Sequence, residues 1–219
     1  MKDITDFVDE VKENGYKKVP ELLDSDFVDE LRADVMKAFK KAKKNFYHTH
    51  TDYVRVLSIQ KSDTENIKYF KFLNQFFNNT FLQRFIKNYF DSEEIIISKI
   101  FLAESSNSGE EVDVLPYKLH FDKTRYLKFM IYLSDVDIGD GGITFANSEW
   151  NTKLQKELLS KKALMEENVV EVDDLSKIEE ITGPSGTGVI FDTNVTHKAG
   201  QVLGENKRLV LRIDTTTKI

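Results

Sequence analysis

The sequence contains no cysteine, only three prolines and ten glycines, and no apolar run that approaches the ~18 residues of a membrane span. Without cysteine, disulfide bonds and zinc–thiolate sites are excluded, which fits a reducing compartment. The first fifteen residues, MKDITDFVDEVKENG, are charged and lack the apolar core of a signal peptide. We therefore expect a cytoplasmic protein that does not enter a membrane.

Basic charge is also scarce relative to acidic charge. The chain has 31 Lys and Arg against 37 Asp and Glu, for a net charge of −6. No basic stripe is present, and the local run over 37–44 is typical of a solvated helix face, so nucleic acid is not expected as the main partner. With 219 residues and no linker-like segment, the chain is expected to form one domain over 1–219.

Apolar spacing predicts helices in the first half of the chain. Large apolar residues recur every four positions from Phe27 to Phe39, which predicts a helix over 26–43 with Ser25 as its N-cap. Further helices are expected over 4–13, over 66–89 with a break at Asn78 and Asn79, and over 152–167.

Short alternating segments predict strands in the second half. After a short strand and turn over 16–23 and a strand over 53–59, strands are expected over 95–103, 118–122, 126–133, 143–146, 188–192 and 207–215. Helices followed by many short strands indicate an α+β domain whose β part is a sandwich or jelly roll.

The period of these strands separates an apolar face from a mixed face. The apolar face holds Leu127, Phe129, Ile131 and Leu133 on one strand and Leu209, Leu211 and Ile213 on another. The opposite face carries Lys128 and Tyr132 on the first strand and Arg208 and Arg212 on the second. A polar lining inside a barrel is unfavourable unless it binds something, and a metal and an anion are the candidate contents.

Two histidines and one carboxylate are the candidate metal ligands. His120 and Asp122 lie two residues apart in a predicted strand, on the same face as Lys118, and His197 follows far downstream. Two histidines and a carboxylate form the facial triad that holds non-haem Fe(II) and leaves positions open. Each residue alone also fits a surface hydrogen bond or a buried histidine, but the combination with Arg208, eleven residues after His197, favours a metal site.

The remaining histidines, His48 and His50, form a His-x-His pair that can bind metal in principle. They lack a nearby acidic partner and stand at a polar helix-to-strand junction, which favours a surface or substrate-access loop. Lys123 and Arg125 follow the predicted iron-binding strand. They fit solvated loop charges or contacts to an anionic substrate.

These motifs resemble those of the Fe(II)/2-oxoglutarate-dependent oxygenases, and most closely the phytanoyl-CoA dioxygenase-like branch. The resemblance covers nearly the whole chain. It rests on Glu13-Asn14-Gly15-Tyr16, on His120-Phe121-Asp122, on the segments 139–145 and 186–192, and on His197 with Arg208.

The resemblance implies a fold and a chemistry. The fold is a double-stranded β-helix, a cupin-like jelly roll, flanked by N-terminal helices. His120, Asp122 and His197 would hold Fe(II), and Arg208, with Arg212 as the alternative, would bind the far carboxylate of 2-oxoglutarate. O₂ would be the oxidant. Related halogenases lack the carboxylate ligand, so its presence here favours hydroxylation, with desaturation or ring chemistry as the alternatives.

The substrate is less defined by the sequence. Lys118, Lys128 and Tyr132 are possible pocket residues, and we expect a small, anionic metabolite acted on by a monomer or homodimer. Two alternatives remain open. One is a non-catalytic metal-binding jelly roll that serves as a sensor or interaction module, and the other is an oxygenase that acts on a protein substrate.

Overall fold

The structure is a computed structural model of the chain. It describes residues 4–41, 47–68, 70–122, 125–147, 169–170 and 174–217, with the side chains of 47–51 and 175 excepted. Within these residues the chain forms two antiparallel sheets and a set of helices, which confirms the predicted mixture of helices and antiparallel strands.

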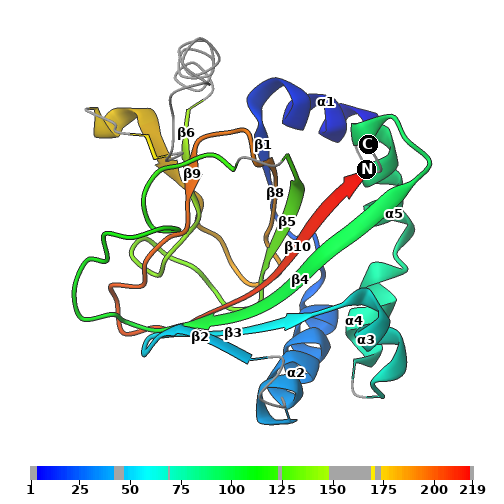
Figure 1. The fold of residues 1–219 in the computed structure, drawn as a ribbon, viewed down its shortest axis with the longest axis horizontal. Helices are drawn as coiled ribbons and strands as arrows, with labels where there is room; N and C mark the ends of the chain where they lie inside the picture. Colours follow the sequence, from blue (N-terminus) through cyan, green and yellow to red (C-terminus); the bar gives the residue numbers. More distant parts are fainter. Residues whose placement is uncertain are drawn as a thin grey trace.

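The two sheets have different sizes and lie opposite one another (Figure 1). In spatial order, the large sheet contains β1 (Tyr16–Val19), β8 (Gly188–Asp192), β5 (Leu127–Tyr132), β10 (Arg208–Thr217), β4 (Ile95–Ser105), β3 (Val54–Ile59) and β2 (Tyr47–Thr51). The small sheet contains β7 (Ile178–Glu180), β6 (Thr144–Ala146) and β9 (His197–Lys198).

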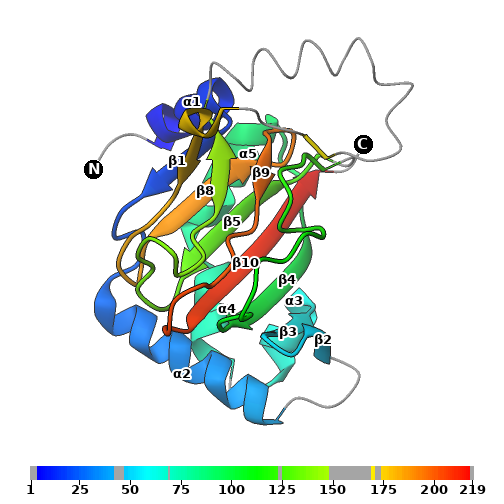
Figure 2. The same cartoon turned by 90° about the vertical axis from the view of Figure 1, so that its left-hand side faces the viewer.

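Helices cover the outer face of the large sheet, away from the small sheet (Figures 1 and 2). They are α1 (Ile4–Asn14), α2 (Ser25–Lys41), α3 (Lys61–Asn66), α4 (Lys71–Phe77) and α5 (Thr80–Phe90), and a short 3₁₀ turn, η2 (Leu175–Lys177), precedes β7.

Side-chain caps explain where two of these helices begin. The predicted cap Ser25 is wrong, because Ser25 is already helical and the carboxylate of Asp24 accepts a hydrogen bond from the Phe27 amide at 2.9 Å. The predicted break near Asn79 is confirmed. The Asn79 side chain accepts from the Phe81 amide at 2.7 Å and starts α5.

The predicted division of strand faces is confirmed. The apolar residues of β5 and β10 pack under the helices, as when the rings of Phe129 and Phe85 meet edge to face with centroids 5.6 Å apart. The opposite faces form a second apolar cluster with the small sheet, which includes Met130, Tyr132 and Val210. The strand period therefore places Lys128 and Arg208 between the two sheets.

Two predictions of local structure are wrong, and a third falls on residues that the structure does not describe. Residues 118–122 do not form a strand; His120 makes isolated bridges to Val169 and His197. His48 and His50 lie on strand β2 and not in a loop. The predicted helix over 152–167 falls outside the described residues.

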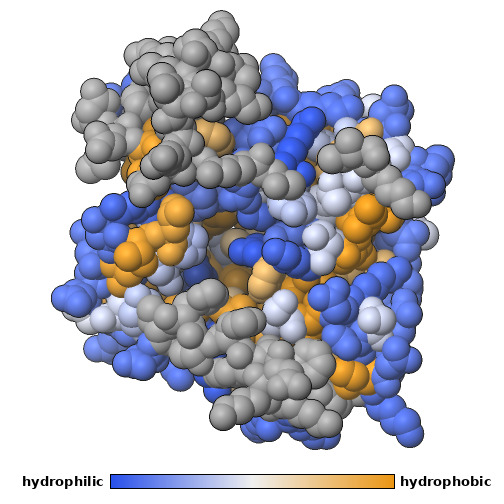
Figure 3. Space-filling view, viewed as in Figure 1, coloured by the Kyte–Doolittle hydropathy of each residue, from blue (hydrophilic) through white to orange (hydrophobic). Residues whose placement is uncertain are grey.

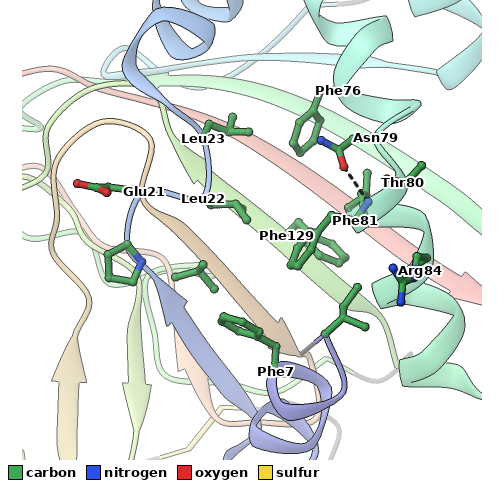
Figure 4. A pocket seen from close by; sticks show the side chains of 14 residues that line it. Phe7, Glu21, Leu22, Leu23, Phe76, Asn79, Thr80, Phe81, Arg84 and Phe129 are labelled. Atoms are coloured by element: carbon green, nitrogen blue, oxygen red, sulfur yellow. Dashed lines mark hydrogen bonds between the residues drawn. The ribbon is translucent and has the colours of Figure 1, made fainter. Parts of the chain in front are cut away.

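A cavity of about 730 Å³ lies on the helix side of the large sheet (Figure 4). Apolar side chains of α1, α5 and β5, among them Phe7, Phe81 and Phe129, line it. Phe129 faces the helices whereas Lys128 faces the small sheet, so this cavity is separate from the candidate metal ligands. Among the described helices, none has the length and apolar character needed to cross a membrane.

Candidate metal centre

A backbone bridge brings the two candidate histidine ligands together. The His120 amide donates to the His197 carbonyl at 2.8 Å, and the His197 amide donates to the His120 carbonyl at the same distance. His197 also pairs with Phe145 of β6. The imidazole centroids are consequently 4.6 Å apart, although the residues are distant in sequence.

Both imidazoles are oriented by backbone carbonyls. Nδ1 of His120 lies 2.7 Å from the Lys118 carbonyl oxygen, and Nδ1 of His197 lies 2.8 Å from the Val195 carbonyl oxygen. A carbonyl only accepts, so each Nδ1 carries the proton and each Nε2 keeps a free lone pair. This is the tautomer that binds a metal through Nε2.

Asp122 completes the group. Its amide donates to the Thr193 carbonyl at 2.9 Å, and its Oδ1 lies 3.7 Å from Nε2 of His120. One ligand atom from each of His120, Asp122 and His197 falls within 4.8 Å of the others. The donor set is that of a facial triad, and its chemistry fits Fe(II) with positions left open.

Burial keeps the histidines neutral. His197 is 4% exposed, and its pKa falls to about 3 because burial disfavours the imidazolium and the Lys128 ammonium repels it. Burial also lowers the pKa of His120. Burial raises the pKa of Asp122, but the charge and hydrogen bond of Lys128, together with smaller contributions from the two histidines, outweigh burial and the net shift is downward. Two neutral imidazoles and one carboxylate are thus present at neutral pH, ready for a cation.

This ionisation makes the metal-free protein sensitive to acid. In the unfolded chain His197 takes up a proton below its ordinary pKa of 6.5, whereas in the folded chain it does so only near 3. Stability is therefore complete above pH 6.5 and is lost as the pH falls. We expect a loss on the order of 2–3 kcal/mol between pH 7 and pH 4.5 from this group, measured by urea unfolding. The His197→Gln variant should show a flatter profile, and an equally steep one would contradict the assignment.

Arg208 is a buried cation without a carboxylate partner among the described residues. It is 6% exposed, its Nη2 donates to Ser105 Oγ at 3.3 Å, and its Nε has no hydrogen-bond partner. Burial lowers the pKa of this guanidinium. Gly141 leaves room beside it: φ is +86° there, and an added Cβ would lie 3.1 Å from Arg208 Nη1. An unsatisfied buried guanidinium is costly, and a carboxylate is the ligand whose geometry it matches.

Arg212 is placed differently from Arg208. Its guanidinium bonds both oxygens of Asp214, at 2.9 and 3.2 Å, and lies over the Phe101 ring at 4.1 Å from the centroid. Because this charge is already paired, Arg208 is the better candidate for an incoming carboxylate.

The three possible pocket residues, Lys118, Lys128 and Tyr132, have different surroundings in the structure. Lys128 lies beside the ligands and bonds Asp122. Lys118 forms an ion pair with Asp113 at 3.1 Å near the surface. Residues 118–122 are not a strand, so the predicted strand face that Lys118 would share with His120 does not exist. Tyr132 is fully buried, with its hydroxyl donating to the Ile181 carbonyl at 2.7 Å and accepting from the Ile143 amide. Tyr132 thus joins the two sheets.

Sequence reasoning missed the residues that hold the Asp122 loop. Thr193 accepts from the amide of Asp122 through its carbonyl, and its Oγ1 accepts from the Tyr126 amide at 2.8 Å. The adjacent Asp192 binds Arg125 at 2.6 Å, so Arg125 is not a free loop cation. Lys123 falls outside the described residues. A polar pair where an apolar strand ends was the available signal for Asp192 and Thr193.

The face of the molecule seen in Figure 3 is hollowed near its middle, with hydrophobic and hydrophilic residues around the hollow. Figure 1 shows the same face, on which β6 and β9 lie opposite the large sheet. The candidate ligands belong to this space between the sheets, since His197 lies on β9.

No family model and no curated protein sequence matches the chain. Solved structures do. The epimerase SnoN from nogalamycin biosynthesis, a non-haem α-ketoglutarate-dependent enzyme, has a TM-score of 0.70 at 14% identity over 98% of this chain and 82% of its own. EctD from S. alaskensis with bound Fe has a TM-score of 0.69 at 13% sequence identity, over 99% of this chain and 79% of its own. HygX from Streptomyces hygroscopicus with nickel and 2-oxoglutarate has a TM-score of 0.65 at 11% identity, over 100% of this chain and 88% of its own. The chain therefore has the fold of the non-haem iron, 2-oxoglutarate-dependent enzymes.

Proposed function

We propose that this chain is a non-haem Fe(II)/2-oxoglutarate-dependent dioxygenase that hydroxylates a small, anionic metabolite. The observation that carries the proposal is the pairing of two features in one interior. His120, Asp122 and His197 supply a facial triad, and Arg208 supplies a buried guanidinium with an unbonded Nε. A structural metal site has no need of that arginine, which disfavours the non-catalytic alternative.

Each residue would have a distinct role. His120 and His197 present Nε2 lone pairs that their backbone hydrogen bonds fix in direction. Asp122 adds the negative charge that a divalent cation requires. Arg208 would hold the far carboxylate of 2-oxoglutarate by a charge-assisted pair. The bound iron would supply the oxidative chemistry, in which 2-oxoglutarate is decarboxylated to succinate while a C–H bond is hydroxylated.

The cosubstrate would lie between the two sheets. The neighbours of Arg208 include Tyr132 of β5, Glu180 of β7 and Tyr117, which is three residues before His120. Both sheets and the segment leading to the metal ligands therefore surround this cation. Such an enclosed site excludes water and positions the reactants.

We extend the proposal to the type of fold, the domain organisation and the class of substrate. We propose that the facing sheets form a double-stranded β-helix of the phytanoyl-CoA dioxygenase-like type, with one domain over the whole chain. SnoN is an epimerase of nogalamycin biosynthesis and HygX binds hygromycin B, and both support a small-molecule substrate over a protein substrate. The decisive test is release of succinate from 2-oxoglutarate with Fe(II) and ascorbate, measured against a panel of amino acids and other metabolites.

Asp122 should determine the outcome of the reaction. Its carboxylate occupies the position that a halide would need, so a true substrate should gain one oxygen atom drawn from O₂. Mass spectrometry of product formed under ¹⁸O₂ with chloride present measures this. The Asp122→Gly variant should lose hydroxylation. A chlorinated product from the unmodified protein would contradict the assignment.

A further inference from the structure

Lys128 is a buried cation in the interior that also holds the metal ligands. Its side chain is 9% exposed, and its Nζ lies 2.6 Å from Oδ2 of Asp122. Lysine is almost never buried unless its charge is paired. The other interior residues of β5, Met130 and Tyr132, are packed in the apolar cluster, so Lys128 is the charged exception on this strand.

The neighbours of Lys128 in the sheet leave Asp122 as its ion-pair partner. In the sheet it stands opposite Asp214 of β10 and Phe191 of β8. Both carboxylate oxygens of Asp214 are bonded by Arg212. The Phe191 ring lies 5.9 Å from the ammonium and contributes a favourable face without competing as an ion pair. Asp122 is therefore the carboxylate that Lys128 contacts directly.

The two oxygens of Asp122 consequently differ. Oδ2 accepts the charge-assisted hydrogen bond from Lys128, whereas Oδ1 lies 3.7 Å from Nε2 of His120, the nitrogen that is available to a metal. An oxygen engaged by an ammonium is less available as a second metal ligand. A carboxylate bound through both oxygens would occupy one more coordination position than one bound through a single oxygen.

We propose that Lys128 is a positioning residue that makes Asp122 a one-oxygen ligand and so keeps a coordination position open for O₂ beside the 2-oxo acid. This inference rests on the proposed function. It differs from a purely structural role, in which the ion pair would only stabilise the fold. It also differs from a substrate-anchoring role, which would leave the metal and its small ligands unaffected.

The test removes the ammonium while retaining the shape of the side chain. The Lys128→Met variant is compared with Lys87→Met, which removes a lysine whose ion pair with Glu93 lies at the surface. Thermal unfolding first shows that each variant folds, and Lys128→Gln replaces the methionine variant if it does not. Anaerobic titration then measures the affinity for Fe(II), and nitric oxide serves as the probe of the open position in the Fe(II)–2-oxoglutarate complex.

The expected shifts have opposite signs. Lys128→Met removes an ammonium that repels a divalent cation and competes for Asp122, so Fe(II) affinity should rise, by about tenfold. With both oxygens available to the metal, nitric oxide should bind more weakly to the Fe(II)–2-oxoglutarate complex. Lys87→Met should change neither. If the ion pair only stabilises the fold, Lys128→Met should lower the melting temperature and leave the affinities for Fe(II) and nitric oxide unchanged.

The outcomes separate the inference from the proposed function. Unchanged Fe(II) and nitric oxide affinities in Lys128→Met would overturn the role of Lys128, and so would weaker Fe(II) binding. Either result leaves the proposed function standing if Asp122→Ala still loses metal. If Asp122→Ala binds Fe(II) as tightly as the unmodified protein, the metal site itself is wrong, and the inference fails with it.

Discussion

The His197→Ala variant is expected to lose stoichiometric binding of Fe(II), and of Mn(II) or Co(II) as surrogates. His197 is buried, its Nδ1 is fixed by the Val195 carbonyl, and its Nε2 is one of three ligand atoms within 4.8 Å. Altering the partner that orients a metal-binding histidine typically costs 10–100-fold in metal affinity, so removing the histidine itself should cost well over about 100-fold. Equilibrium dialysis followed by metal analysis measures this loss.

The chain provides a matched control for this experiment. His48 and His50 lie on the edge strand β2, and His50→Ala removes an imidazole that we do not assign to the metal. That variant should keep full metal content. If His197→Ala retains its metal while His50→Ala loses it, the His-x-His pair is the metal site and the triad is not.

The convergence of the three candidate metal ligands was predictable because their pattern is local in sequence or fixed by strand period. His120 and Asp122 are two residues apart, and His197 follows the apolar strand β8. The expected strand over 118–122 is wrong, yet the two ligands still converge. The His120 amide and the Asp122 amide bond carbonyls of His197 and Thr193, which reproduces the spacing of a strand without forming one.

The faces of β5 and β10 were predictable for the same reason. Alternation assigned Phe129 to the helices and Lys128 to the interior, and both placements are confirmed. The partners of the interior charges were harder to predict. Arg212 and Asp214 share a face two residues apart, so their ion pair follows from the period. The contact between Lys128 and Asp122 depends on the long-range hydrogen bond from the Asp122 amide to the Thr193 carbonyl, which no local pattern specifies.

The shortest strands could not be predicted. β7 and β9 contain three and two residues and lack the length needed to show alternation. They form because β6 lies between them and pairs through its backbone with β7 on one edge and with β9 on the other. Their placement nevertheless matters, since β9 begins with His197. The site therefore depends on a sheet whose strands are defined by tertiary pairing more than by their own sequence.

Arg208→Ala is expected to weaken 2-oxoglutarate far more than metal. Loss of a buried charge-assisted pair costs on the order of 2–5 kcal/mol, which corresponds to roughly 30- to 5,000-fold in the dissociation constant. Isothermal titration of the Mn(II)-loaded protein with 2-oxoglutarate under anaerobic conditions measures this effect. Metal affinity should change little, because Arg208 contacts Ser105 and none of the three ligands directly.

The matched control is Arg212→Ala, which removes an arginine from the same face of β10. Arg212 is already paired with Asp214, so its loss should disturb that carboxylate and leave 2-oxoglutarate binding largely intact. Arg208, in contrast, is a buried cation whose Nε is unbonded, and a dianionic ligand relieves that cost. If Arg212→Ala carries the loss of affinity and Arg208→Ala does not, the carboxylate must bind further along β10, and Asp214 must release Arg212 to receive it.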